Sequence, residues 1–380
     1  MASAGGLIFG VINIVGNFGT VFVDQAYWQR AIAAQPSSTV KGFLLGGMCW
    51  FAIPFTLATT MGLTAVALDV ELTPEQVQLG LTVPAAASVL MGEIGAIMVL
   101  VMLFMAVTSA GSAELIAVSS LLTYDIYRTY KNPNATGKQL LKVSRAVIVA
   151  FGLGMGALAV VLLGMGLSLG FVYLAMGILI GSAVIPIALT IIWNKTTRAG
   201  AVSGALIGVV LSLTTWTSVA ASEADGVVDI ASLGGAFPML YGNVVAILSS
   251  GLICVVVSLA QRKTFDWKDL DKHMSLVTDD MEQHEITATE AAKREQDEEQ
   301  LKKAFKFSVR GGGLLTLICV VFWPMPLYFS GYVFDFGFYG LWVGIAIAWV
   351  SCAAAIIIFM PIVEARKGIA KVASGKKATG

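Results

Sequence analysis

Apolar residues in this chain come in long blocks rather than in a pattern that repeats with each helical turn. Blocks of about 20 residues have the length that an α-helix needs to cross the ~30 Å hydrocarbon core of a membrane. The sequence contains nine such blocks, at residues 7–33, 40–67, 88–124, 143–165, 168–193, 199–219, 238–260, 309–331 and 337–363. This pattern predicts an all-α integral membrane protein with about nine spans.

The composition supports the same prediction. Of the 380 residues, 57% are hydrophobic and 13% are charged, whereas about a quarter of the residues in a soluble domain carry a charge. The mean hydropathy is +0.82. The third apolar block is too long for one perpendicular crossing, so we expect its N-terminal part to lie in a loop or at the membrane interface.

Charges on the connections between the blocks predict the orientation. All 24 Lys and Arg residues fall on alternate connections or in the C-terminal tail. On the intervening connections, every charged residue is acidic. Basic connections face the cytoplasm, which predicts a cytoplasmic C-terminus and a cytoplasmic polar segment at 261–306. With an odd number of spans, residue 1 lies outside without a positively charged leader. We therefore interpret the chain as the later part of a longer protein.

Few residues offer catalytic or metal-binding chemistry. The four cysteines fall in apolar blocks, and the two histidines, His273 and His284, belong to the polar segment. These residues provide no nucleophile–base pair and no set of metal ligands inside a span. The sequence therefore predicts that the protein is not an enzyme and has no metal, no cofactor and no nucleic-acid partner.

Two carboxylic acids, Asp24 and Glu114, lie inside predicted spans. A lone carboxyl group at this depth costs at least a few kcal/mol, so it faces a cavity or a partner, or it takes up a proton. For both residues the alternative is a structural hydrogen bond between helices. Glu114 precedes Asp125, at the inner end of its span, by eleven residues, or ~16 Å along a helix. This depth favours a functional role for Glu114.

Small side chains recur at helical spacing on the span of Glu114, at Ala106, Ser109, Ala110, Ala113 and Ala117. Such a stripe lets another backbone approach closely. Close packing accounts for the alanines, but it does not account for Ser109 and Glu114, which lie on and beside the stripe. We therefore expect this face to border a polar cavity.

The first span contains the sequence GNFGTVFVDQAYWQRAIAA, which begins at Gly16. Gly16, Asn17 and Gly19 weaken a helix in the middle of a membrane, and free backbone groups are tolerated there only where they line a polar cavity. Secondary transporters bind their solutes at broken helices of this kind. The segment therefore predicts a helix break at Asn17 with a substrate cavity beside it.

Several motifs resemble the sodium:solute symporter family. DQAYWQR, from Asp24 to Arg30, resembles the DQxxxQR signature of this family, and VKG at Val40 fits the same pattern in the next span. The third span ends in TSAGSAELIAVSSLLTYDIYR, which is similar to the small-residue helix of the family with its Thr-x-Asp-Ile-Tyr end. Together with FAIPFTLATTMGL, these segments resemble the urea active transporter branch, the urea–proton symporters, over nearly the whole chain.

The resemblance implies a fold of two inverted five-helix repeats with peripheral helices. On this scheme residues 1–193 form the second repeat, residues 194–380 contribute four further C-terminal transmembrane helices, and the first repeat is missing. The resemblance also implies secondary active transport of urea at the plasma membrane, with polyamines as a possible further substrate class of fungal relatives.

Candidate substrate-binding residues follow from the resemblance and from the chemistry of urea. By resemblance, Asn17 and Tyr173 fall at or near substrate-contacting positions of the family. Urea carries four N–H donors and one acceptor, so a urea site needs acceptors and flat aromatic walls. The side chains of Asp24 and Gln25 supply the acceptors, and those of Phe18 and Trp50 supply the walls.

The sodium site of the family falls on Ala106, Ser109 and Ala110, where the second hydroxyl of the family pattern is missing. This departure favours proton coupling, because a proton needs one titratable group rather than a cage of oxygens. Glu114, one turn beyond Ala110, or failing that Asp24, is the candidate proton carrier. Two alternatives stay open: a sodium-coupled symporter of another small neutral solute, and a half-transporter that does not transport.

Overall fold

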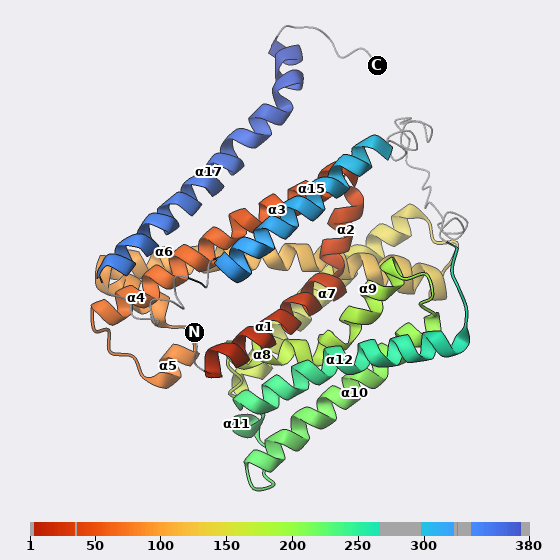
Figure 1. Ribbon diagram of the computed structural model, residues 1–380, viewed down its shortest axis with the longest axis horizontal. Helices are drawn as coiled ribbons and strands as arrows, with labels where there is room; N and C mark the ends of the chain where they lie inside the picture. The colour runs from red at the N-terminus through yellow and green to blue at the C-terminus, as the bar shows by residue number, and fades with distance from the viewer. Residues whose placement is uncertain (1–3, 35, 267–297, 323–324, 326–335, 374–380) are drawn as a thin grey trace. The chain divides into compact units, whose positions relative to one another are not determined.

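The computed structural model describes residues 4–34, 36–266, 298–322, 325 and 336–373 (Figure 1). In this part of the chain the regular elements are all helices, and eight helical stretches are long and apolar enough to span a membrane. The prediction of an all-α membrane protein is therefore confirmed. Eight of the nine predicted spans match these stretches, whereas the predicted span 309–331 lies partly outside the described residues.

Contacts divide the chain into two compact units. The first consists of Met1–Ala31, Pro74–Gly80 and Met102–Glu285, and the second of Ile32–Thr73, Leu81–Val101 and Ile286–Gly380. The predicted boundary at residue 193 was placed between an expected structural repeat and the helices that follow it. A division by contacts does not test such a boundary, so it stays a prediction.

The first unit holds most of the packed helices. Its elements are α1 (Ala4–Val23), most of α2 (Gln25–Ala33), α5 (Pro74–Gln78), the later part of α6 (Thr82–Ser120), the π-helix η2 (Leu121–Lys131), α7 (Gly137–Gly164), α8 (Leu169–Ile180), the 3₁₀ turn η3 (Gly181–Ala183), α9 (Val184–Ile192), α10 (Arg198–Glu223), α11 (Ile230–Leu233) and α12 (Ala236–Gln261). The predicted span 168–193 therefore consists of two α-helices joined by a 3₁₀ turn.

Small residues spaced four apart let α10 and α12 pack side by side as an antiparallel pair (Figure 1). The facing residues, all buried, are Gly200, Gly204 and Gly208 on α10 and Ser250, Cys254 and Ser258 on α12. A Cβ added to Gly204 would lie 2.7 Å from the Ser250 carbonyl oxygen. Close approach through small residues is the usual way in which transmembrane helices associate, because lipid provides no hydrophobic driving force between them.

A glycine contact also joins α1 and α8. A Cβ added to Gly177 would lie 3.0 Å from the backbone nitrogen of Gly16 and 2.0 Å from Oδ1 of Asn243. Asn243 is fully buried, and its Nδ2 donates to the carbonyl oxygens of Leu174, at 3.0 Å, and Met239, at 2.8 Å. This amide ties α8 to α12. The buried apolar core around it consists of Ile12, Ala175, Ile178 and Met239.

The second unit is built around α3. Its elements are α3 (Pro36–Ala52), the π-helix η1 (Ile53–Ala58), α4 (Thr59–Ala67), the first part of α6, α15 (Glu298–Leu317), the π-helix η5 (Ile318–Phe322) and α17 (Phe336–Ala373). Helix α3 packs against α15 and α17. Nε1 of Trp349 donates to the carbonyl oxygen of Met48 at 3.0 Å, and the Trp349 ring meets Phe51 edge to face. These contacts fasten α17 to α3.

The long third block is divided at Gly92. Its φ of 63° and ψ of −147° are not helical, so α6 consists of two helices with a kink between them. Glycine tolerates a positive φ, because it has no Cβ to clash with the backbone. A separate N-terminal part of this block was expected from its length. Its predicted place at the membrane interface stays a prediction.

Candidate functional site

The first span is interrupted at Asp24, and the prediction of a break at Asn17 is wrong. Helix α1 continues through Asn17 as far as Val23, Asp24 is not helical, and α2 begins at Gln25. Tertiary packing overrides the weak helix propensity of the glycines. A Cβ on Gly19 would lie 2.8 Å from Cγ1 of Ile180, so this glycine allows close packing rather than a break.

Local hydrogen bonds define the break at Asp24. Oδ1 of Asp24 accepts a hydrogen bond from the backbone N–H of Ala26 at 2.7 Å, which is the action of a side chain that caps the start of a helix. Nε1 of Trp28 donates to the carbonyl oxygen of Phe22 at 2.8 Å, across the break. These bonds satisfy backbone groups that the interruption leaves without helical partners.

The carboxyl group of Glu114, on α6, lies beside that of Asp24. The two groups interact electrostatically, and Arg30 also acts electrostatically on Glu114. One turn further along α6, the carbonyl oxygen of Ala117 accepts a hydrogen bond from Nε2 of Gln29 at 3.4 Å. The segment from Asp24 to Arg30 therefore contacts the same face of α6 through both a carboxyl and an amide side chain.

These residues border a pocket of about 370 Å³ within the first unit. Its polar lining comes from Thr20, Asp24, Gln25 and Glu114, and its apolar wall includes Met176 and Ile180 of α8. Among the ten lining residues that the structure describes, none is basic. The pocket therefore presents hydrogen-bond acceptors beside an apolar surface, and it suits a small solute without negative charge.

Two other predicted substrate residues lie together in a separate cluster. The Tyr173 hydroxyl, on α8, donates to Oδ1 of Asn13, and Nδ2 of Asn17 donates to the same oxygen at 3.4 Å. Neither Asn17 nor Tyr173 lines the pocket beside Glu114. Asn13 was not among the predicted site residues, although an asparagine one turn before Asn17 in an apolar helix is a recognisable signal.

The remaining predicted residues are not gathered at the pocket within the described part of the first unit. Phe18 is 49% exposed, and the centroid of its ring lies 6.2 Å from the centroid of the Phe22 ring. Trp50 belongs to the second unit, on α3, where its indole is 68% exposed. The three predicted ion-site residues are exposed on α6 before the turn that carries Glu114; they are Ala106, Ser109 and Ala110.

Sequence reasoning also passed over part of the pocket. The Thr20 hydroxyl donates to the Gly16 carbonyl oxygen at 3.1 Å and lies 3.4 Å from the sulfur of Met176. Thr20 lines the pocket from α1 and precedes Asp24 by four positions, which is about one helical turn. This spacing was the signal that could have placed Thr20 at the site.

Comparison with known proteins identifies close relatives. The urea-proton symporter DUR3 of Oryza sativa subsp. japonica is 50% identical over 375 residues, which cover 99% of this chain and 51% of that protein. The probable urea active transporter 1 of Schizosaccharomyces pombe is 38% identical over 392 residues, covering 100% of this chain and 57% of that protein. The urea active transporter of Saccharomyces cerevisiae is 35% identical over 438 residues, covering 97% and 58%.

The chain thus spans a little over half the length of these curated relatives. No solved structure matches it. The sequence profile of the sodium:solute symporter family matches residues 2–208, which include the break at Asp24, the pocket and the 3₁₀ turn after α8. With more than half of its residues matched by that profile, the chain belongs to the sodium:solute symporter family.

Proposed function

We propose that this chain takes part in secondary active transport of urea, coupled to the symport of protons. The names of the relatives, a urea-proton symporter and urea active transporters, support the substrate and the class of transport. The proposal concerns transport rather than catalysis, because these relatives are transporters. The observation that carries it is the carboxyl pair of Asp24 and Glu114 beside a pocket at an interrupted span.

Urea suits the chemistry of this pocket. It is planar and uncharged, and its two NH₂ groups offer four donors, while its carbonyl oxygen accepts. The side chains of Asp24, Glu114 and Gln25 supply acceptor oxygens, and the Thr20 hydroxyl, which donates to the Gly16 carbonyl oxygen, can accept from a urea N–H group. The absence of basic residues from the described lining disfavours a carboxylate or phosphate substrate.

The same carboxyl pair supplies a group for coupling. Two carboxyl groups that lie beside each other can share one proton, because the neutral form donates a hydrogen bond and the ionised form accepts it. We propose that this pair holds the coupled proton, with Glu114 as the principal carrier and Asp24 as its partner. Exchange of that proton with the solution on each side of the membrane would then accompany the passage of urea.

The predicted sidedness belongs to the proposal as well. The connections that carry all the basic residues face the cytoplasm, the C-terminus lies on that side, and the membrane is the plasma membrane. Substrate residues Asn17 and Tyr173, in the cluster around Asn13, are proposed as a second contact point for urea along its path, and Phe18 and Trp50 stay proposed aromatic contacts. Ala106, Ser109 and Ala110 stay proposed as a coupling-ion region.

Uptake by proteoliposomes that contain the whole gene product tests the proposal. Labelled urea should accumulate when an inward proton gradient is imposed at a clamped membrane potential, and an inward sodium gradient at symmetric pH should give none. Accumulation that follows the sodium gradient alone would instead favour the sodium-coupled alternative. Absence of uptake under both gradients, with the protein folded, would favour a half-transporter that does not transport.

Polyamines are a second substrate class to be tested in the same vesicles. A pocket with two carboxyl groups and no basic lining residue among those described can attract an ammonium group when the carboxyls are ionised. We expect spermidine to compete with labelled urea more effectively at high pH than at low pH. Equal competition at both pH values would contradict an interaction with this carboxyl pair.

A further inference from the structure

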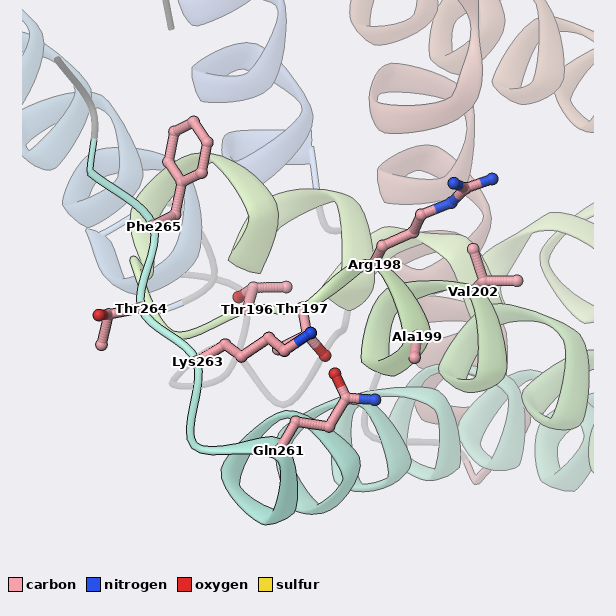
Figure 2. A pocket seen from close by; sticks show the side chains of 9 residues that line it. All are labelled: Thr196, Thr197, Arg198, Ala199, Val202, Gln261, Lys263, Thr264 and Phe265. Atoms are coloured by element: carbon pink, nitrogen blue, oxygen red, sulfur yellow. The ribbon is translucent and has the colours of Figure 1, made fainter. Parts of the chain in front are cut away.

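A second pocket of the first unit lies far along the chain from the carboxyl pair, where α10 begins and α12 ends. Its volume is about 610 Å³. Figure 2 shows the side chains around it, which come from the loop before α10, from the first turn of α10 and from the extended segment after α12. The lining residues are Thr196, Thr197, Arg198, Ala199, Val202, Gln261, Lys263, Thr264 and Phe265.

The walls of this pocket are fixed by hydrogen bonds. The backbone N–H of Thr197, a buried residue, donates to the Ser258 hydroxyl at 3.2 Å, which joins the start of α10 to the end of α12. The backbone N–H of Phe265 donates to the carbonyl oxygen of Asn194 at 2.7 Å, so the segment after α12 runs back against the loop before α10. Arg262, with a φ of 51°, makes the turn between α12 and this segment.

The residues that line the pocket include two basic side chains and no acidic one, although the acidic residue Asp266 directly follows Phe265. The two basic residues are Arg198 and Lys263, and the adjacent residues Lys195 and Arg262 are basic as well. In Figure 2 the Lys263 side chain extends toward Thr197 and the amide of Gln261, whereas the Arg198 side chain extends away from them. The two cations and the Gln261 amide N–H groups are donors that suit a phosphate group.

The pocket lies at the level where the membrane spans end. The candidate span of α10 begins at Arg198, and that of α12 ends at Gln261. The pocket residues therefore sit at one surface of the bilayer, on the side that carries the basic connections. On the sidedness proposed above, that side faces the cytoplasmic leaflet, where anionic lipids concentrate and where basic pockets between helices bind phospholipid headgroups.

We propose that this pocket binds the phosphate-bearing headgroup of an anionic phospholipid of the cytoplasmic leaflet. Lys263 and Arg198 contact the phosphate, the Gln261 amide N–H groups offer further hydrogen bonds, and Phe265, 38% exposed, lies at the level of the membrane interface. The headgroup would join the ends of α10 and α12. The proposal rests on the sidedness given above and not on the transport of urea.

Lipid binding by the purified full chain tests the proposal. The protein is placed in nanodiscs of phosphatidylcholine, and dansyl-labelled phosphatidylserine or dansyl-labelled phosphatidylcholine is titrated in, with energy transfer from the protein tryptophans as the signal. We expect the anionic probe to bind in preference to the neutral one. The double variant Arg198→Gln with Lys263→Gln should weaken binding of the anionic probe by roughly ten- to thirtyfold, because each basic residue near a membrane surface strengthens binding by about fivefold.

Matched variants separate this site from general surface charge. Lys138→Gln with Lys142→Gln removes two exposed basic residues from the start of α7, on the same side, and should leave the preference unchanged. Thr264→Glu changes an exposed residue of the pocket lining and should also weaken binding of the anionic probe. This variant provides the test if the double variant fails to fold. Circular dichroism checks that each protein used is helical.

Three results would overturn the proposal. Equal binding of the anionic probe by the wild type and by the folded pocket variants would remove the pocket from lipid binding. An equal loss in the α7 control would assign the preference to overall charge. Displacement of the probe by low millimolar inorganic phosphate would assign the pocket to a free phosphate instead of a lipid.

Discussion

The carboxyl groups of Asp24 and Glu114 lie beside each other at one pocket, although the two residues are ninety positions apart in the chain. Asp24 also caps α2 through the backbone N–H of Ala26. One residue therefore belongs both to the break in the first span and to the pair that we propose for proton coupling. A change in the protonation of the pair alters the acceptor that holds the start of α2, which links a proton to the geometry of the break.

Substitutions of Asp24 separate its two roles. Asparagine caps helices about as well as aspartate, so Asp24→Asn should keep the thermal stability of the protein but lose uptake driven by a proton gradient, because an amide does not take up a proton. Asp24→Ala should lose this uptake and about 1 kcal/mol of stability besides. Unfolding in detergent and uptake in vesicles measure the two effects. Full proton-driven uptake by Asp24→Asn would show that this carboxyl is not needed for coupling.

Gly177→Ala should destabilise the first unit. The added Cβ would lie 2.0 Å from Oδ1 of Asn243 and 3.0 Å from the backbone nitrogen of Gly16, and overpacking of this kind costs about 1–3 kcal/mol. Gly154→Ala on α7 is the control, because its Cβ would meet no described atom within 4 Å. Midpoints of thermal unfolding in detergent compare the variants. Equal midpoints for the two would contradict the close contact between α1 and α8.

The short helix α11 should weaken in acid. The backbone N–H of Ser232 donates to the Asp229 carboxylate at 2.8 Å. This hydrogen bond holds the pKa of Asp229 below its ordinary value of 3.8. A depressed pKa in the folded state stabilises that state above the unfolded pKa, and the stabilisation is lost as the pH falls through the folded pKa.

Hydrogen exchange measures this effect. The Ser232 amide should lose protection at a pH below 3.8 relative to neutral pH, after correction for the intrinsic exchange rate. In Asp229→Ala, protection should be low at both pH values. The amides around Trp216, whose Nε1 donates to the Leu233 carbonyl oxygen at 2.9 Å, provide an internal comparison. If the protection of the Ser232 amide in the wild type did not change with pH, this result would contradict the capping of α11 by Asp229.

The sequence predicts the class of fold and most of its spans, because the lengths of apolar blocks are set by the thickness of the membrane. Asp24 and Glu114 were recognisable as candidates, since a carboxyl group inside an apolar block is costly. Their contact was not predictable, because it depends on how α2 packs against α6. The predicted break at Asn17 was wrong for a related reason: Gly19 weakens a helix in isolation, but here it packs against Ile180.

Some features were readable but were not recognised. Gly200, Gly204 and Gly208 recur every four residues, as expected for a face that packs closely against another transmembrane helix. Asn13 precedes Asn17 by one helical turn. The polar pocket at the start of α10 could not be recognised in this way, because its lining comes from two segments about sixty residues apart whose contact depends on the packing of α12 against α10.

Proton-driven accumulation of urea by Glu114→Gln is the most direct measurement of the proposed coupling. The whole gene product carrying this substitution should fail to accumulate labelled urea under an inward proton gradient, while it still exchanges labelled for unlabelled urea without a gradient. Glu93→Gln, an exposed carboxyl group on the same helix, should behave as the wild type. Accumulation at the wild-type level by Glu114→Gln would contradict the role of the carboxyl pair in coupling.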